Sequence, residues 1–191
     1  MRLPVRQIRD LLQTLHGVQV SVGEIVEVLH RLVAHAQPLL DELKASLRAS
    51  PAVQADETGW REDGLNGYVW SVGTPTVRYY EYHHSRAGEV VELWQVCAPF
   101  VGTQALMHTL CERVEHFLPE LFVFVAYPGV PSDNNLAERS VRPLVIARKI
   151  SGGTRSPKGS STRMGLASLF GTWMAQGLNP FHQCLALLMY G

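Results

Sequence analysis

The sequence predicts an α/β fold, in which a hairpin of helices precedes a small antiparallel sheet and further helices follow it. Two changes in the spacing of apolar residues, which divide the chain into three stretches, support this prediction. Apolar residues recur every three or four positions up to about residue 50, alternate with polar residues from residue 52, and return to the helical spacing near residue 103. A chain of 191 residues has room for a helical segment, residues 1–50, and one α/β domain, residues 51–191.

Two helices joined by a tight turn are predicted at the N-terminal end. The first spans residues 4–15 and ends at Gly17, and the second begins with a capping box of Ser21 and Glu24. Pro38 should kink the second helix. A DNA-reading helix-turn-helix and an α-hairpin used for packing or self-association both fit this pattern. The few basic side chains on the second helix favour the hairpin.

Three antiparallel strands are predicted in succession after residue 51. They cover residues 52–56, 67–74 and 76–83, with turns at 64–67 and 74–75. Further helices are expected from Ser85 through Trp94 and from near Thr103 to about Leu121.

The stretch SDNNLAERSVRPLVIARKISGG, residues 132–153, contains the most informative polar residues. Asp133 should cap a short helix, and Pro143 should end it at Arg142. On this helix Glu138 shares one face with Asn134 and Arg142, each four residues away. Glu138 therefore either serves a site or pairs with Arg142 on its own helix.

Beyond Pro143 the chain is expected to be extended through residue 150 and to form a loop over 152–161. Helices are then predicted at about 163–177 and, with Asn179 and Pro180 as its start signals, up to about 189.

The formal charge of the chain is zero but unevenly distributed. Residues 1–138 contain 10 Lys and Arg against 17 Asp and Glu, whereas residues 139–191 contain 7 against none. Such a basic segment could bind the phosphates of DNA or could be a solvated loop. The candidates for phosphate contacts are Arg139, Arg142, Arg148, Lys149, Arg155, Lys158 and Arg163. Trp60 is a candidate for stacking on a base, with a buried aromatic as the alternative.

The cysteines and the apolar runs limit the class of protein. The three cysteines are widely spaced and form no CxxC pair, which argues against a disulfide framework or a zinc–cysteine site. Charged residues interrupt the N-terminal apolar stretch, and no uncharged apolar run is long enough to cross a bilayer. We therefore expect a cytoplasmic protein with no membrane partner.

Two motifs, DETGW at residues 56–60 and DNNLAERSVRP at residues 133–143, resemble those of the transposases of the bacterial insertion-sequence sixty-six family. The resemblance implies a ribonuclease-H-like domain that binds Mg²⁺ or Mn²⁺ through three carboxylates of the DDE type and cuts and joins double-stranded DNA at element ends. By this resemblance Asp56 is the first catalytic and metal-binding carboxylate and Glu138 is the last. It also implies a homo-oligomer, or association with intact transposase subunits.

The resemblance is interrupted near residues 95–104. Relatives have a further strand with a second essential Asp there, whereas this chain has no Asp between Asp63 and Asp133. We interpret this as an internal deletion that leaves the ribonuclease-H-like domain incomplete, the transposase inactive and one sheet edge unpaired. The alternatives are a non-catalytic module that binds DNA or intact subunits, and a small nuclease that recruits Glu57 or Asp63 as its middle ligand.

Overall fold

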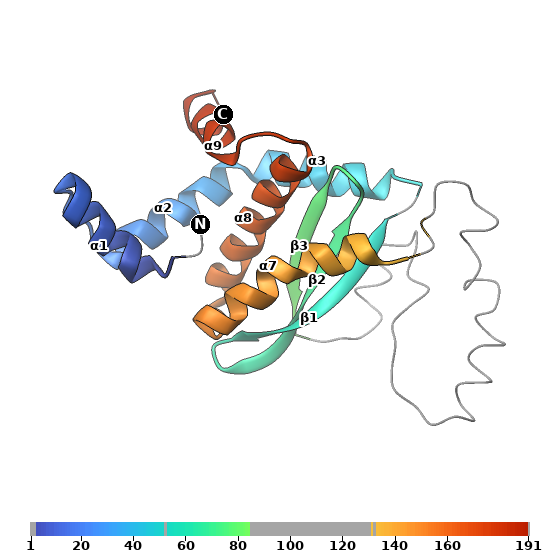
Figure 1. The fold of residues 1–191 in the computed structure, drawn as a ribbon, viewed down its shortest axis with the longest axis horizontal. Helices are drawn as coiled ribbons and strands as arrows, with labels where there is room; N and C mark the ends of the chain where they lie inside the picture. Colours follow the sequence, from blue (N-terminus) through green and yellow to red (C-terminus); the bar gives the residue numbers. More distant parts are fainter. Residues whose placement is uncertain (1–2, 52, 85–130, 132, 191) are drawn as a thin grey trace.

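The computed structural model describes residues 3–51, 53–84, 131 and 133–190 (Figure 1). Within these ranges the chain forms six helices and one three-stranded sheet. The elements in chain order are α1 (Val5–His16), α2 (Val22–His35), α3 (Gln37–Arg48), β1 (Gln54–Glu62), β2 (Leu65–Gly73), β3 (Arg78–His83), α7 (Asn135–Ser151), α8 (Pro157–Ala175) and α9 (Pro180–Tyr190). No helix in the described ranges has the length and apolar character needed to cross a membrane. The predicted helices at 85–94 and 103–121 lie outside the described residues.

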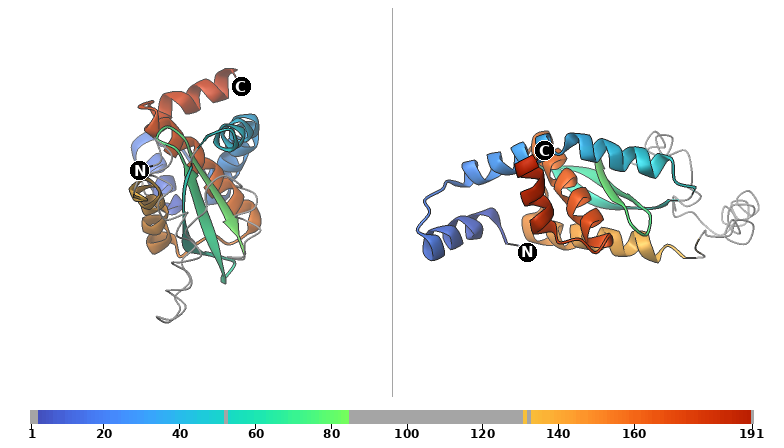
Figure 2. Two further views of the ribbon diagram at one scale, coloured as in Figure 1. Left: turned by 90° about the vertical axis from the view of Figure 1, so that its right-hand side faces the viewer. Right: turned by 90° about the horizontal axis from the view of Figure 1, so that it is seen from above.

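The sheet is antiparallel in the order β1-β2-β3 and separates two apolar cores. The core on one face contains the leucines of α3 together with Trp70 and Val72 of β2. The core on the other face contains Leu144 and Ala147 of α7 together with Trp60 of β1. Helix α8 runs along β3 and contributes to both cores, so that helices enclose the sheet on two faces and one edge (Figure 2).

Side-chain hydroxyls of α8 satisfy the outer edge of β3. The Tyr80 N–H donates to Ser168 Oγ at 2.8 Å, and the Arg78 N–H donates to Thr172 Oγ1 at 2.9 Å. The Thr172 hydroxyl in turn donates to the Arg78 carbonyl at 2.9 Å. Ser168 and Thr172 are buried and lie four residues apart, so one face of the helix presents both hydroxyls to the strand. The helix thus takes the place of a fourth strand at this edge.

Helix α7 continues through Pro143, so the prediction that it ends at Arg142 was wrong, as was the extended stretch to residue 150. A proline inside a helix removes one backbone hydrogen bond and crowds the preceding turn. Here the buried residues of α7 form one stripe at three- and four-residue spacing on both sides of Pro143, which is itself exposed. Packing of this stripe against β1 and β2 outweighs the cost of the proline. The stripe consists of Ala137, Ser140, Val141, Leu144 and Ala147.

Helix α8 begins at Pro157, six residues before the predicted start at Arg163. Ser156 caps it by accepting the Gly159 N–H at 3.1 Å, and Pro157 takes the first helical position. The Gly- and Ser-rich first turns suggested a loop, but Thr162 is buried and its hydroxyl lies 2.5 Å from His30 Nδ1 on α2. Tertiary contacts therefore set the helix start.

Strand β1 runs through the whole DETGW motif to Glu62, whereas the sequence predicted that it ends at Asp56. The β1–β2 turn is Asp63-Gly64, not residues 64–67, and both residues have positive φ angles of 50° and 79°. These angles suit a two-residue type I′ hairpin, for which Asp-Gly is a strong sequence signal.

The remaining predictions for the ends of the chain were confirmed, with one exception. The Ser21–Glu24 capping box is formed, and Gly17 ends α1 in the left-handed conformation. The prediction of one long helix kinked at Pro38 was wrong, because the chain breaks at Ala36 into α2 and α3 and Pro38 lies in the first turn of α3. Asn179 caps α9 through a 2.9 Å bond from the Phe181 N–H.

We predict that Ser168→Ala lowers the free energy of unfolding by about 1–3 kcal/mol, because it leaves the buried Tyr80 N–H without an acceptor. Thermal and urea denaturation would measure the loss. The matched control is Ser161→Ala, an exposed serine on the same helix. Equal stability of the two variants would contradict the role assigned to Ser168.

Candidate functional site

Asp56 lies on β1, opposite Ser71 of β2, and is partly buried. Its Oδ1 accepts the Glu57 N–H at 2.8 Å. Burial is the main cause that raises the pKa of Asp56 above its usual value, and the negative charges of Glu57 and Glu138 raise it further. The hydrogen bond from Glu57 opposes these effects in part. A bound cation or a proton would relieve this concentration of negative charge.

Glu138 lies in the first turn of α7 and is exposed. Its negative charge is the smallest of the causes that raise the pKa of Asp56, although the two residues are 82 positions apart in the sequence. In the described part of the chain no ion pair joins Glu138 to Arg142, so the alternative in which this acid only pairs on its own helix is not the observed state.

Two hydrogen bonds fasten the start of α7 to the start of β1. Gln54 Nε2 donates to the Asp133 carbonyl at 2.8 Å, and Asn134 Nδ2 donates to the Ala55 carbonyl at 3.2 Å. The Asp133 side chain accepts the Asn135 N–H at 3.1 Å, as a residue at a helix start does, although the capping position itself is Asn134. These bonds hold the start of α7, the helix that carries Glu138, against the start of β1, the strand that carries Asp56. Sequence analysis placed Asn134 on the same helix face as Glu138 but did not predict the bonds that Gln54 and Asn134 make between α7 and β1.

A second attachment holds the C-terminal half of α7 to β1. Arg148 Nη1 donates to Thr58 Oγ1 at 3.2 Å and also to the Gly59 carbonyl. Arg148 was a candidate for phosphate contacts, but in this structure its guanidinium is bonded within the protein. The chain following α7 then forms a parallel bridge, with Thr154 N donating to the Arg61 carbonyl at 2.8 Å.

Trp60 is only 2% exposed and packs between the sheet and α7. Its Nε1 donates to Thr154 Oγ1 at 3.1 Å. Trp60 is therefore a buried aromatic residue, the second of the two predicted possibilities, and its ring is not available for stacking on a base.

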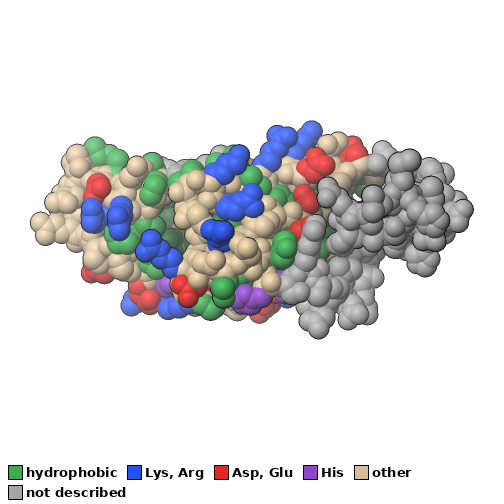
Figure 3. Space-filling model, turned by 90° about the horizontal axis from the view of Figure 1, so that it is seen from below, with side chains coloured by type: hydrophobic (Ala, Val, Ile, Leu, Met, Phe, Trp, Pro, Cys, Tyr) green, Lys and Arg blue, Asp and Glu red, His purple; other side chains and the backbone are tan. Residues whose placement is uncertain are grey.

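The other basic candidates lie at the surface. They are Arg139, Arg142, Lys149, Arg155, Lys158 and Arg163. Arg139, Arg142 and Lys149 are three and seven residues apart along α7 and share its outward side. Lys158 Nζ lies 3.5 Å from Glu27 of α2, an exposed pair that contributes little. Figure 3 shows Lys and Arg side chains spread across the middle of one face of the molecule.

A metal site of three or more His, Cys, Asp or Glu side chains does not occur within residues 3–51, 53–84, 131 and 133–190. Asp56 and Glu138 could supply two oxygen ligands, which suits Mg²⁺ or Mn²⁺. Glu57 belongs to the opposite face of β1, because side chains alternate along a strand. Asp63 lies in the hairpin turn, seven residues beyond Asp56.

Comparison with known proteins identifies the family. A family model described as Transposase IS66 family matches residues 1–103 and 99–162. The chain belongs to this family. The two matched segments of the IS66-family chain meet at residues 99–103. No curated protein and no solved structure was found to match it.

For the IS66-family chain we predict that Arg148→Met lowers the free energy of unfolding by about 1–3 kcal/mol, since it leaves two acceptors on β1 without their donor. Lys149→Met, at the exposed neighbouring position, should change it by less than about 0.5 kcal/mol. Urea denaturation of both variants would measure these changes. Equal losses of unfolding free energy in Arg148→Met and Lys149→Met would contradict a structural role for Arg148.

We also predict that Asp56→Asn raises the melting temperature at neutral pH. Because the folded protein raises the pKa of this carboxyl, its ionisation destabilises the fold. The stabilisation contributed by protonated Asp56 is complete below its usual pKa of 3.8 and is lost as the pH rises through the higher folded value. The advantage of Asp56→Asn should therefore disappear near pH 3. Differential scanning calorimetry would show this, and an undiminished advantage at pH 3 would contradict it.

Proposed function

We propose that this IS66-family chain is a transposase polypeptide that binds double-stranded DNA and keeps two carboxylates of a metal site, Asp56 and Glu138, but does not cut DNA. The observation that supports this proposal is the attachment of the start of α7, which carries Glu138, to the start of β1, which carries Asp56, without a three-ligand group in the described ranges. The meeting of the two family-matched segments at residues 99–103 supports an internal deletion as the cause.

The chemistry of phosphoryl transfer explains why a missing carboxylate matters. In two-metal sites, cations about 4 Å apart stabilise the attacking and leaving oxygens of an in-line displacement. Mg²⁺ prefers oxygen ligands and near-ideal octahedral geometry. Asp56 and Glu138 alone would hold such an ion weakly, because each further carboxylate adds charge and fixes geometry. The chain's own contribution is therefore a fixed pair of acids that attracts a cation without completing the site.

DNA binding by the basic surface does not depend on the metal site. Exposed Arg and Lys side chains of α7 and the loop after it follow the acidic pair along the chain. Cations of this kind bind the phosphates of any DNA sequence and release condensed counterions. The proposed partner is double-stranded DNA at element ends, either for this chain alone or together with intact transposase subunits.

The small-nuclease alternative receives less support from the geometry. Glu57 belongs to the opposite face of β1 from Asp56, and Asp63 lies at the far end of the hairpin. Neither residue forms a three-ligand group with Asp56 and Glu138 among the described residues.

We predict that purified protein binds linear duplex DNA without nicking supercoiled plasmid in Mg²⁺ or Mn²⁺. Fluorescence anisotropy should show an affinity that falls steeply with salt. The double variant Arg142→Gln, Lys149→Gln should bind more weakly and have a salt slope reduced by about 2, because two phosphate contacts are removed.

The absence of cleavage and the binding of DNA are each contradicted by a different result. Metal-dependent nicking that disappears in both Asp56→Ala and Glu138→Ala would show that another ligand completes the site. Unchanged affinity and salt slope in the double variant would show that these cations do not contact DNA. Circular dichroism of each variant excludes loss of folding as the cause.

A further inference from the structure

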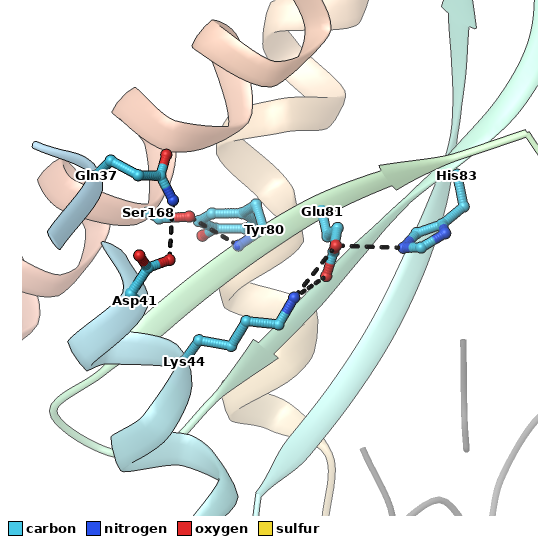
Figure 4. A network of polar contacts seen from close by, with 7 residues as sticks. All are labelled: Gln37, Asp41, Lys44, Tyr80, Glu81, His83 and Ser168. Carbon is cyan, nitrogen blue, oxygen red and sulfur yellow. Dashed lines mark hydrogen bonds and ion pairs between the residues drawn. The ribbon is translucent and has the colours of Figure 1, made fainter. Parts of the chain in front are cut away.

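Two adjacent histidines at the end of β3 lie near carboxylates on opposite faces of the sheet. His83 Nε2 lies 3.9 Å from Glu81, and His84 Nε2 lies 3.6 Å from Glu62. The first carboxylate already has a cation, because Lys44 of α3 approaches Glu81 at 3.3 Å (Figure 4). Among the described residues, His84 is the only ion-pair partner of Glu62.

Glu62 is an unusual carboxylate for its position. Its side chain is 4% exposed, and its buried Oε2 has no hydrogen-bond partner in the part of the chain that the structure describes. A charged group removed from water is strongly destabilising unless an opposite charge or a metal ion compensates it. The buried end of Glu62 therefore indicates that a positive group is needed beside it.

Tyr82 contacts the imidazole of His84 at Nδ1, the ring nitrogen that does not face Glu62. Tyr82 Oη lies 3.3 Å from His84 Nδ1, and the two rings meet edge to face with centroids 5.1 Å apart. Gly67 of β2 makes this arrangement feasible, because a Cβ there would clash with the Tyr82 ring. His84 Nε2 lies 3.6 Å from Glu62 Oε1, the carboxylate oxygen beside the buried Oε2.

The separation of 3.6 Å is informative. It is too long for a charge-assisted hydrogen bond, which is about 2.7–2.9 Å. It is close to the distance between two ligand atoms on one tetrahedral zinc ion, about 3.4 Å from the usual Zn–N and Zn–O bond lengths. We propose that Glu62 and His84 form a binding site for Zn²⁺ or a similar transition metal ion, with water completing the coordination.

The chemistry of these residues matches this class of ion. Imidazole nitrogen and carboxylate oxygen suit zinc, whereas Mg²⁺ favours oxygen alone. When Nε2 binds the metal, Nδ1 carries a hydrogen and donates it to Tyr82 Oη, the kind of second interaction that fixes a metal-bound histidine. The site lies six residues, about 20 Å, along β1 from Asp56, so it is separate from the acidic pair of the proposed function.

The test is isothermal titration of the untagged, reduced protein with ZnCl₂. We expect one zinc per chain, and we expect Glu62→Gln and His84→Ala each to weaken the affinity at least about tenfold. His83→Ala is the matched control and should bind as the wild type does. The variant Asp56→Ala, Glu138→Ala should also keep its zinc affinity, which separates this site from the proposed transposase site.

Two results would overturn the proposal. The first is wild-type zinc affinity in Glu62→Gln or His84→Ala, or no binding by the wild type at millimolar zinc. The second is a thiolate-to-cobalt charge-transfer band on substitution with Co²⁺, which would assign the metal to a cysteine. His84 is exposed and Glu62→Gln keeps the shape of the side chain, so both variants should fold.

Discussion

A three-stranded sheet has two edges of unpaired backbone groups, and the need to satisfy both edges determines how the described part of this protein is built. Hydroxyls of α8 bond to β3, and the segment around α7 bonds to β1 through Asn134, Arg148 and Thr154. We expected an unpaired edge where a strand had been lost. The observed contacts show that side chains and a single backbone bridge occupy several carbonyls of β1. The bond from Asn134 to the Ala55 carbonyl also holds the start of α7, which carries Glu138, against the start of β1, which carries Asp56.

The sequence predicted local features well where a short pattern decides them. The capping box at Ser21, the glycine at position 17 and the start of α9 are of this kind. It failed at Pro143 and at the start of α8, where packing against the sheet and α2 overrides the local preference of proline, glycine and serine. A single sequence does not reveal such distant partners.

The candidate site was predictable only in part, and for a similar reason. Two motifs pointed to Asp56 and Glu138, and hydrogen bonds attach the helix that carries Glu138 to the strand that carries Asp56. The roles of the neighbouring residues were harder to predict. Arg148 and Trp60 are of residue types that often contact DNA, but here their side chains form hydrogen bonds within the protein. A charged or aromatic side chain in a sequence gives its chemistry, whereas its direction depends on the helix or strand that carries it. The buried acid Glu62 could not be recognised without the structure, since an isolated glutamate is usually exposed.

The continuity of α7 through Pro143 has a mechanical consequence for the acidic pair. Because α7 is continuous, Glu138 near its start lies about 15 Å along the helix axis from Arg148. Hydrogen bonds attach this helix to β1 at Asn134 and at Arg148. Backbone movement therefore gives the two carboxylates little freedom to separate when both are charged. The pKa of Asp56, raised mainly by burial and to a smaller extent by the charges of Glu57 and Glu138, therefore stays raised until Asp56 binds a proton or a cation.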